Sequence, residues 1–81
     1  MNRQEAMTAV KESLSHVVPG AEVESLAPDA KFRDALELDS IDFLSFVEDL
    51  ATRTGCRIDE DDYPRLTTLA DSADLITARA A

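Results

Sequence analysis

The sequence predicts an all-α fold, namely a small four-helix bundle with a long ordered loop between helices 1 and 2 and a short helix 3. Three observations support this prediction. Apolar residues recur at intervals of three and four, which places their side chains on one face of a helix. Side chains suited to helix capping precede these segments. Glycine or proline follows the first two of them, where a helix is expected to stop.

The first helix is predicted to run from about Arg3 to Val17. Asn2 and Glu5 stand three residues apart, as in a capping box, and Pro19 with Gly20 ends the segment. Apolar side chains at helical spacing define the face expected to pack in the core. This face comprises Ala6, Met7, Val10, Leu14 and Val17.

A long connection follows at residues 18–39, with Pro19, Gly20 and Pro28 as breakers of regular structure. We expect it to be an ordered loop because apolar side chains occur along its length and can pin it to the helices. These side chains are Val23, Leu26, Phe32, Leu36 and Leu38. Residues 32–36 are expected to form a short helical turn.

The second helix is predicted to run from Ser40 to about Thr54. Asp39 or Ser40 can serve as its N-cap, and Gly55 suits the left-handed conformation that commonly follows a helix. Ser40 is therefore expected at a helix N-terminus. The face predicted to be buried comprises Phe43, Phe46, Val47 and Leu50.

The other faces of this helix combine apolar and acidic side chains. Ile41 and Leu44 are expected to be accessible, together with Glu48 and Asp49. A mixed apolar and acidic surface suits docking to another protein. The alternative for Leu44 is that it fills the edge of the core.

Two shorter segments complete the predicted bundle. The acids at residues 59–62 suit the start of a short third helix. They lack the spaced ligands of an EF-hand loop, so no metal site is predicted. Thr68 and Asp71 have the spacing of a cap before the last helix. Its predicted buried face comprises Leu69, Ala73, Ile76 and Ala80.

Charge excludes several classes of partner. The chain has 17 acidic and 8 basic residues and a net charge of −9. It has no basic cluster, so neither nucleic acid nor insertion at an anionic membrane is expected. Ten acids and only three bases lie in the segment from Arg33 to Asp62, with both ends included. The negative charge therefore marks one region of the chain.

Residues 1–81 are expected to form one domain. A domain of this size can bury a hydrophobic core but hardly has room for a deep active-site cleft as well. Its size therefore favours a binding or carrier function over catalysis. Cys56 is the lone cysteine; we expect it, like Ile58, to point inward. His16 has no nucleophile or ligand set near it in sequence, so no catalytic role is assigned to it. No apolar run resembles a signal peptide or a membrane span, and we therefore expect a cytoplasmic protein. We also expect it to be a monomer.

The tripeptide Asp39-Ser40-Ile41 resembles the Asp-Ser-Leu attachment motif of the acyl carrier proteins. The resemblance extends over nearly the whole chain. A first helix, a long loop, a serine opening an acidic second helix, a short third helix and a last helix follow one another in that family's order.

This resemblance implies that Ser40 accepts 4′-phosphopantetheine from coenzyme A through a phosphopantetheinyl transferase. The group would carry acyl intermediates as thioesters between enzymes of fatty-acid, specialised lipid or polyketide biosynthesis. The implied partners are acyl-transferring or condensing enzymes with basic docking patches. The implied contacts with them are Asp39, Ile41, Asp42, Leu44, Glu48 and Asp49. Ser40 has no histidine or lysine nearby in sequence to act as its base, so it is expected to be modified rather than catalytic.

The chain departs from the family pattern at several positions. Glu37 replaces the glycine common two positions before the motif's aspartate, Phe43 and Phe46 are bulky, and Glu48 stands where an apolar contact is common. Two alternatives remain open. One is a peptidyl carrier protein, although Asp39 before the serine favours the acyl branch. The other is an acidic helical interaction module without a prosthetic group, in which the serine is only an N-cap.

Overall fold

The computed structural model describes residues 1–80. The predicted single domain at residues 1–81 also includes Ala81, which lies outside the described residues. Within the described part the elements are helical and no strand occurs. Their bounds are α1 Arg3–Val17, η1 Val23–Ser25, α2 Phe32–Ala35, α3 Ser40–Thr54, η2 Glu60–Arg65 and α4 Leu69–Arg79, where η denotes a 3₁₀-helix. The prediction of a small all-α bundle with a long ordered loop is confirmed.

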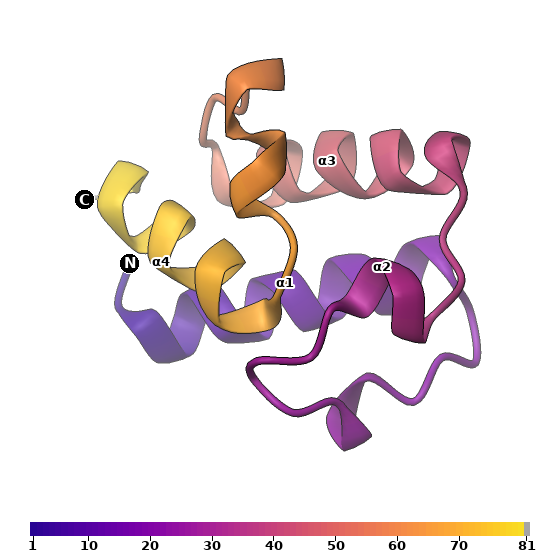
Figure 1. Cartoon of the computed structure of the whole chain (residues 1–81). Helices are drawn as coiled ribbons and strands as arrows, with labels where there is room; N and C mark the ends of the chain where they lie inside the picture. Colours follow the sequence, from indigo (N-terminus) through magenta and orange to yellow (C-terminus); the bar gives the residue numbers. More distant parts are fainter. Residues whose placement is uncertain (81) are drawn as a thin grey trace.

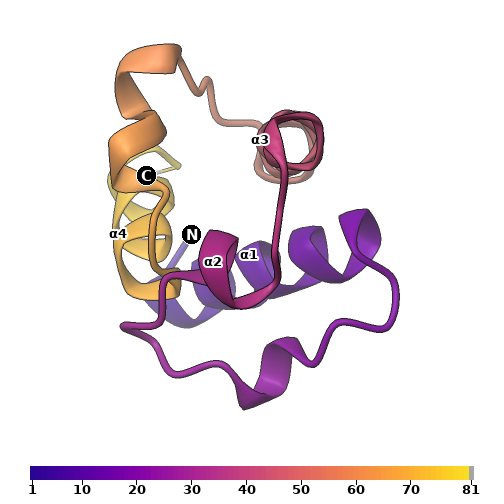
Figure 2. The ribbon, with the colours of Figure 1, turned by 45° about the vertical axis from the view of Figure 1, so that its right-hand side comes forward.

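Helix α1 packs against both α3 and α4 (Figure 1). In Figure 2 α3 is seen end-on while α1 runs across the view, so the two helices cross rather than lie parallel. Small side chains make this approach possible: Ala9 and Ser13 are buried, and the Ser13 hydroxyl donates to the Phe46 carbonyl of α3 at 3.3 Å. Neither residue belonged to the predicted stripe.

Hydrogen bonds at the helix ends confirm the predicted caps. The Asn2 side chain accepts from the Glu5 amide, and the Glu5 carboxylate accepts from the Asn2 amide, which completes the capping box of α1. Thr68 caps α4 by accepting from the Asp71 amide at 3.0 Å. Gly55 ends α3 with φ of 72°.

The core joins the helices to the long loop. Of the loop's predicted anchors, Val23, Phe32 and Leu38 are buried, and Leu26 and Leu36 pack against the core while partly exposed. The rings of Phe32 and Phe46 meet edge to face, with centroids 5.2 Å apart. The predicted core is incomplete at one end: Ala80 is only half-buried, whereas Leu75 of α4 is buried and was not predicted.

The loop is also held to the segment before α4. Phe32 N donates to Thr67 O at 3.2 Å, and Ala70 N donates to Pro28 O at 2.9 Å. An isolated antiparallel bridge between Lys31 and Thr68 lies beside them. These bonds fix the entry to α2, and α2 in turn leads to Ser40.

The short third helix is present as the 3₁₀-helix η2. Pro64 lies inside it and, having no amide proton, donates no backbone hydrogen bond to the preceding turn. At its start the Asp59 amide donates to the Asp62 carboxylate at 2.9 Å. Arg79 of α4 forms an ion pair with Asp62 and donates to the Arg57 carbonyl at 3.1 Å. The end of α4 thereby anchors η2.

Candidate functional site

The turn before Ser40 is a Schellman motif that closes α2. Leu38 N donates to Arg33 O at 2.9 Å, and Glu37 N donates to Asp34 O at 3.3 Å. Glu37 occupies the left-handed position of this motif with φ of 55°. The turn that glycine usually makes is therefore retained with a glutamate, at a conformational cost of about 1–2 kcal/mol.

Ser40 is the first residue of α3, and its side chain is exposed. Asp39 is the N-cap, extended in backbone, and its carboxylate accepts from the Asp42 amide at 2.8 Å. Of the two N-cap candidates from the sequence, Asp39 is the one the structure selects. The serine hydroxyl is therefore not the N-cap acceptor of α3.

Arg33 is the side chain that contacts the Ser40 hydroxyl. Its Nη2 atom donates to Ser40 Oγ at 3.4 Å, and its guanidinium carbon lies 4.7 Å from the centroid of the Phe43 ring. Sequence reasoning missed this residue. The only available signal was a basic residue seven positions before the serine, and nothing in that spacing indicates a contact across a turn.

A pocket of about 490 Å³ opens beside the serine between α2, α3 and η2. Phe43 and Tyr63 both line it, and their rings meet edge to face with centroids 5.4 Å apart. Leu44 and Leu66 add apolar side chains, while the cations Lys31 and Arg33 lie toward α2.

The apolar docking candidates lie on the outer surface of α3. Ile41 is 74% exposed and Leu44 is 47% exposed. The alternative that Leu44 fills the core edge is therefore wrong. With Glu48, which is also exposed, they stand at i, i+3 and i+7, which places all three on one stripe of the helix.

The acidic candidates are not equivalent. Asp39 and Glu48 are exposed and Asp42 is half-buried. The Asp49 side chain is only 18% exposed, because it accepts from His16 of α1 at 2.8 Å and from Arg53 at 3.1 Å. Partial burial alone raises the pKa of the Asp49 carboxyl, but hydrogen bonds to its neighbours, His16 and Arg53 among them, bring that pKa below its usual value. The expectation of an accessible Asp49 is therefore corrected: this carboxylate joins α3 to α1.

Other chemistry is sparse in the described residues. Cys56 is buried, as expected for a small hydrophobic side chain. No group of three histidine, cysteine or acidic side chains within residues 1–80 is arranged to hold a metal ion. Over the same range, no helix is both long and apolar enough to cross a bilayer.

Ser40 is thus an exposed residue at the start of an acidic helix in a small helical bundle. A family model described as "Phosphopantetheine attachment site" matches residues 9–76, and the chain belongs to this family. The domain that this model describes is the site of covalent 4′-phosphopantetheine attachment.

Two curated acyl carrier proteins are similar in sequence to this chain over most of their length. The chain is 26% identical over 76 residues to an acyl carrier protein of Rubrobacter xylanophilus, covering 94% of this chain and 93% of that protein. It is 28% identical over 76 residues to an acyl carrier protein of Acidothermus cellulolyticus, covering 94% of this chain and 89% of that protein. No solved structure matches the chain.

The residues around Ser40 fit such a group. The serine hydroxyl is exposed, so an attached chain can leave the surface without displacing core side chains. A phosphate on the first residue of a helix also faces the positive end of the helix dipole. The attachment therefore requires no rearrangement of the bundle.

Proposed function

We propose that this chain is an acyl carrier protein that holds acyl groups on 4′-phosphopantetheine attached to Ser40. The observation that carries the proposal is the placement of Ser40: an exposed hydroxyl at the first position of α3, within the matched family region. When attached, the group ends in a thiol that holds its cargo as a thioester. The two similar acyl carrier proteins favour acyl over peptidyl cargo.

The chain supplies the nucleophile for its own modification, and within residues 1–80 the side chain hydrogen-bonded to Ser40 Oγ is that of Arg33. A guanidinium donates hydrogen bonds and accepts none, so Arg33 does not take up the hydroxyl proton. A phosphopantetheinyl transferase must therefore provide the general base and bind coenzyme A. On this account the protein is a substrate and carrier, not an enzyme.

The surface beside Ser40 is proposed to dock the partner enzymes. Ile41 and Leu44 present apolar area, while Asp39, Asp42 and Glu48 surround it with negative charge. Basic patches on acyl-transferring or condensing enzymes complement this surface, and charge of this kind chiefly speeds association and orients the partner. Asp49 adds to the negative electrostatic potential of this surface, but its carboxylate is hydrogen-bonded to His16 and Arg53.

The setting that this function implies is fatty-acid, specialised lipid or polyketide biosynthesis, with the carrier acting as a cytoplasmic monomer. The intact mass of the protein isolated from its native cells tests this setting, because an attached acyl group reports the pathway directly.

Loading in vitro tests the proposed function. The unmodified chain is incubated with coenzyme A and a broad-specificity transferase, and the intact mass is measured. We expect one phosphopantetheine added to the wild type and to S45A, in which an exposed serine of the same helix is removed, and none added to S40A. An unchanged wild-type mass, with the transferase active on a control carrier, contradicts the proposal.

A further inference from the structure

Arg33 differs from the other cations of the acidic region at residues 33–62. Arg53 is paired with carboxylates of α1 and α3, and Arg57 is paired with a carboxylate two residues away. No carboxylate in the described part of the chain lies within ion-pairing distance of Arg33. This guanidinium is therefore available to an anion that the protein does not itself supply.

Two contacts hold Arg33 at the serine. Its guanidinium stacks on the Phe43 ring, at 4.7 Å from the ring centroid, while Nη2 lies 3.4 Å from Ser40 Oγ. The Schellman hydrogen bond from Leu38 N to Arg33 O, at 2.9 Å, ties the backbone of α2 to the segment that leads into α3. A phosphate carried by Ser40 Oγ places its free oxygens one bond beyond the phosphorus, within reach of this guanidinium.

We propose that Arg33 is a positioning residue that forms an ion pair with the phosphodiester on Ser40. The inference rests on the proposed attachment at Ser40. The added phosphate lies close to the carboxylates of Asp39 and Asp42, so it experiences repulsion that an unpaired cation offsets. Arginine suits the task because its planar fork can donate two hydrogen bonds to one phosphate.

This ion pair sets the direction in which the arm leaves the serine. Held by Arg33, the phosphodiester lies on the α2 side of Ser40, at the edge of the pocket lined in part by Phe43, Tyr63 and Leu66. The first part of the arm then passes near η2 instead of extending freely from α3.

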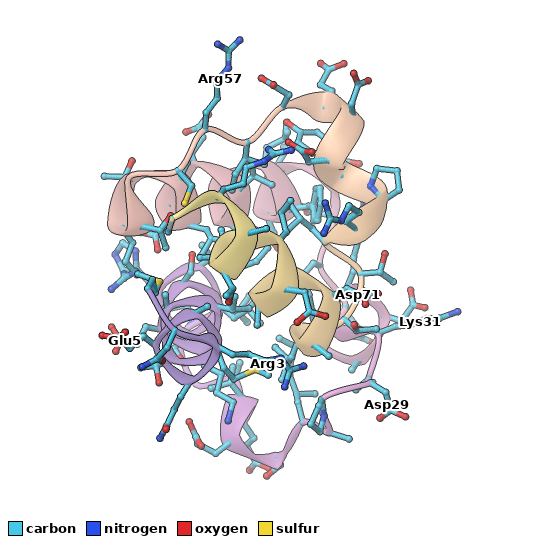
Figure 3. All side chains as sticks on the ribbon, turned by 90° about the vertical axis from the view of Figure 1, so that its left-hand side faces the viewer. Arg3, Glu5, Asp29, Lys31, Arg57 and Asp71 are labelled. Atoms are coloured by element: carbon cyan, nitrogen blue, oxygen red, sulfur yellow. The ribbon has the colours of Figure 1, made fainter. Side chains whose placement is uncertain are left out.

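The test uses the loaded protein with a nitroxide at the thiol end of the arm, installed by the transferase from labelled coenzyme A. Broadening of the Tyr63 and Leu66 amide signals in NMR spectra reports how often the arm lies near η2, and the ³¹P shift reports the phosphodiester. We compare the wild type with R33Q, R33K and K31Q. Lys31 is a matched control because it also lines the pocket but extends outward from the molecule (Figure 3).

In the wild type we expect broadening that fades at about 1 M salt, where the screening length is about 3 Å. R33Q reduces the population near η2 by about twofold to fivefold, as for an exposed ion pair, and moves the ³¹P shift. R33K, which keeps the charge without the fork, gives a smaller reduction, and K31Q leaves both signals as in the wild type.

Loading is checked first by intact mass, so the two proposals fail separately. A wild type that accepts no phosphopantetheine refutes the attachment itself. A loaded R33Q with unchanged broadening and ³¹P shift overturns the role of Arg33. So does a K31Q variant that loses as much as R33Q, because the effect is then one of net charge.

Discussion

The left-handed conformation of Glu37 leads to a stability prediction that can be isolated from charge. Glu37 holds φ of 55° at the turn that delivers Ser40 to α3. A non-glycine residue in this region costs about 1–2 kcal/mol. Replacing it with glycine removes that cost but increases the freedom of the unfolded chain by about 0.5–1 kcal/mol. For E37G we therefore expect a net gain of about 0.5–1 kcal/mol in the free energy of unfolding.

Two matched variants separate the backbone effect from other effects. E37Q removes the same charge and keeps the strain, so its stability should stay within about 0.5 kcal/mol of the wild type. A35G places glycine at the end of α2, where no left-handed residue is needed, and should lose about 0.5–1 kcal/mol.

The assay is urea denaturation followed by far-UV circular dichroism, with thermal melting as a second measure. A gain of this size in a chain of 81 residues raises Tm by about 2–8 °C. If E37G is no more stable than E37Q, the glutamate is not strained and the reasoning is wrong. An E37G variant that falls as far as A35G leads to the same conclusion.

Three further predictions concern acid stability, a buried hydroxyl and docking. The hydrogen bond from Arg79 lowers the pKa of Asp62 from 3.8 to about 2, so the stability that this pair contributes is complete above the unfolded pKa and is lost as pH falls from about 4 to about 2. D62N should therefore lose less stability than the wild type over this pH range. An equal loss in D62N and the wild type contradicts the assignment. Ser72 Oγ is buried without a hydrogen-bond partner in residues 1–80, so S72A should raise the free energy of unfolding by about 1 kcal/mol in urea denaturation, whereas a loss indicates a partner. D42N and E48Q should each weaken binding to the transferase about twofold to fivefold at low salt, measured by titration calorimetry. D29N is the control, because Asp29 lies on the loop before α2 (Figure 3), and it should leave the binding unchanged. Equal effects of all three variants place the docking surface elsewhere.

Features that depend on local sequence were predictable. The bounds of α1 and α3 follow from apolar spacing and from caps within three residues of the helix start, and the structure places both helices where the sequence predicted. Ile41 and Leu44 were expected outside the core stripe of α3 for the same reason, and both are exposed.

Features that depend on contacts between distant residues were not predictable. Asp49 counted as an accessible acid because its partner His16 lies 33 residues away on another helix. Arg33 reaches Ser40 only because the Schellman turn at Glu37 folds the chain between them. The sequence showed that Glu37 departs from the family's glycine, but the conformation that it adopts is decided by the turn and not by its side chain.

Ser40 is proposed to carry the phosphopantetheine. The most direct test of this attachment is peptide-level mass spectrometry of the protein purified from its native cells. We expect a phosphopantetheine mass, with or without an acyl group, on the peptide containing Ser40. A protein that carries no such mass in cells with an active transferase, or carries it on another residue, contradicts the attachment at Ser40.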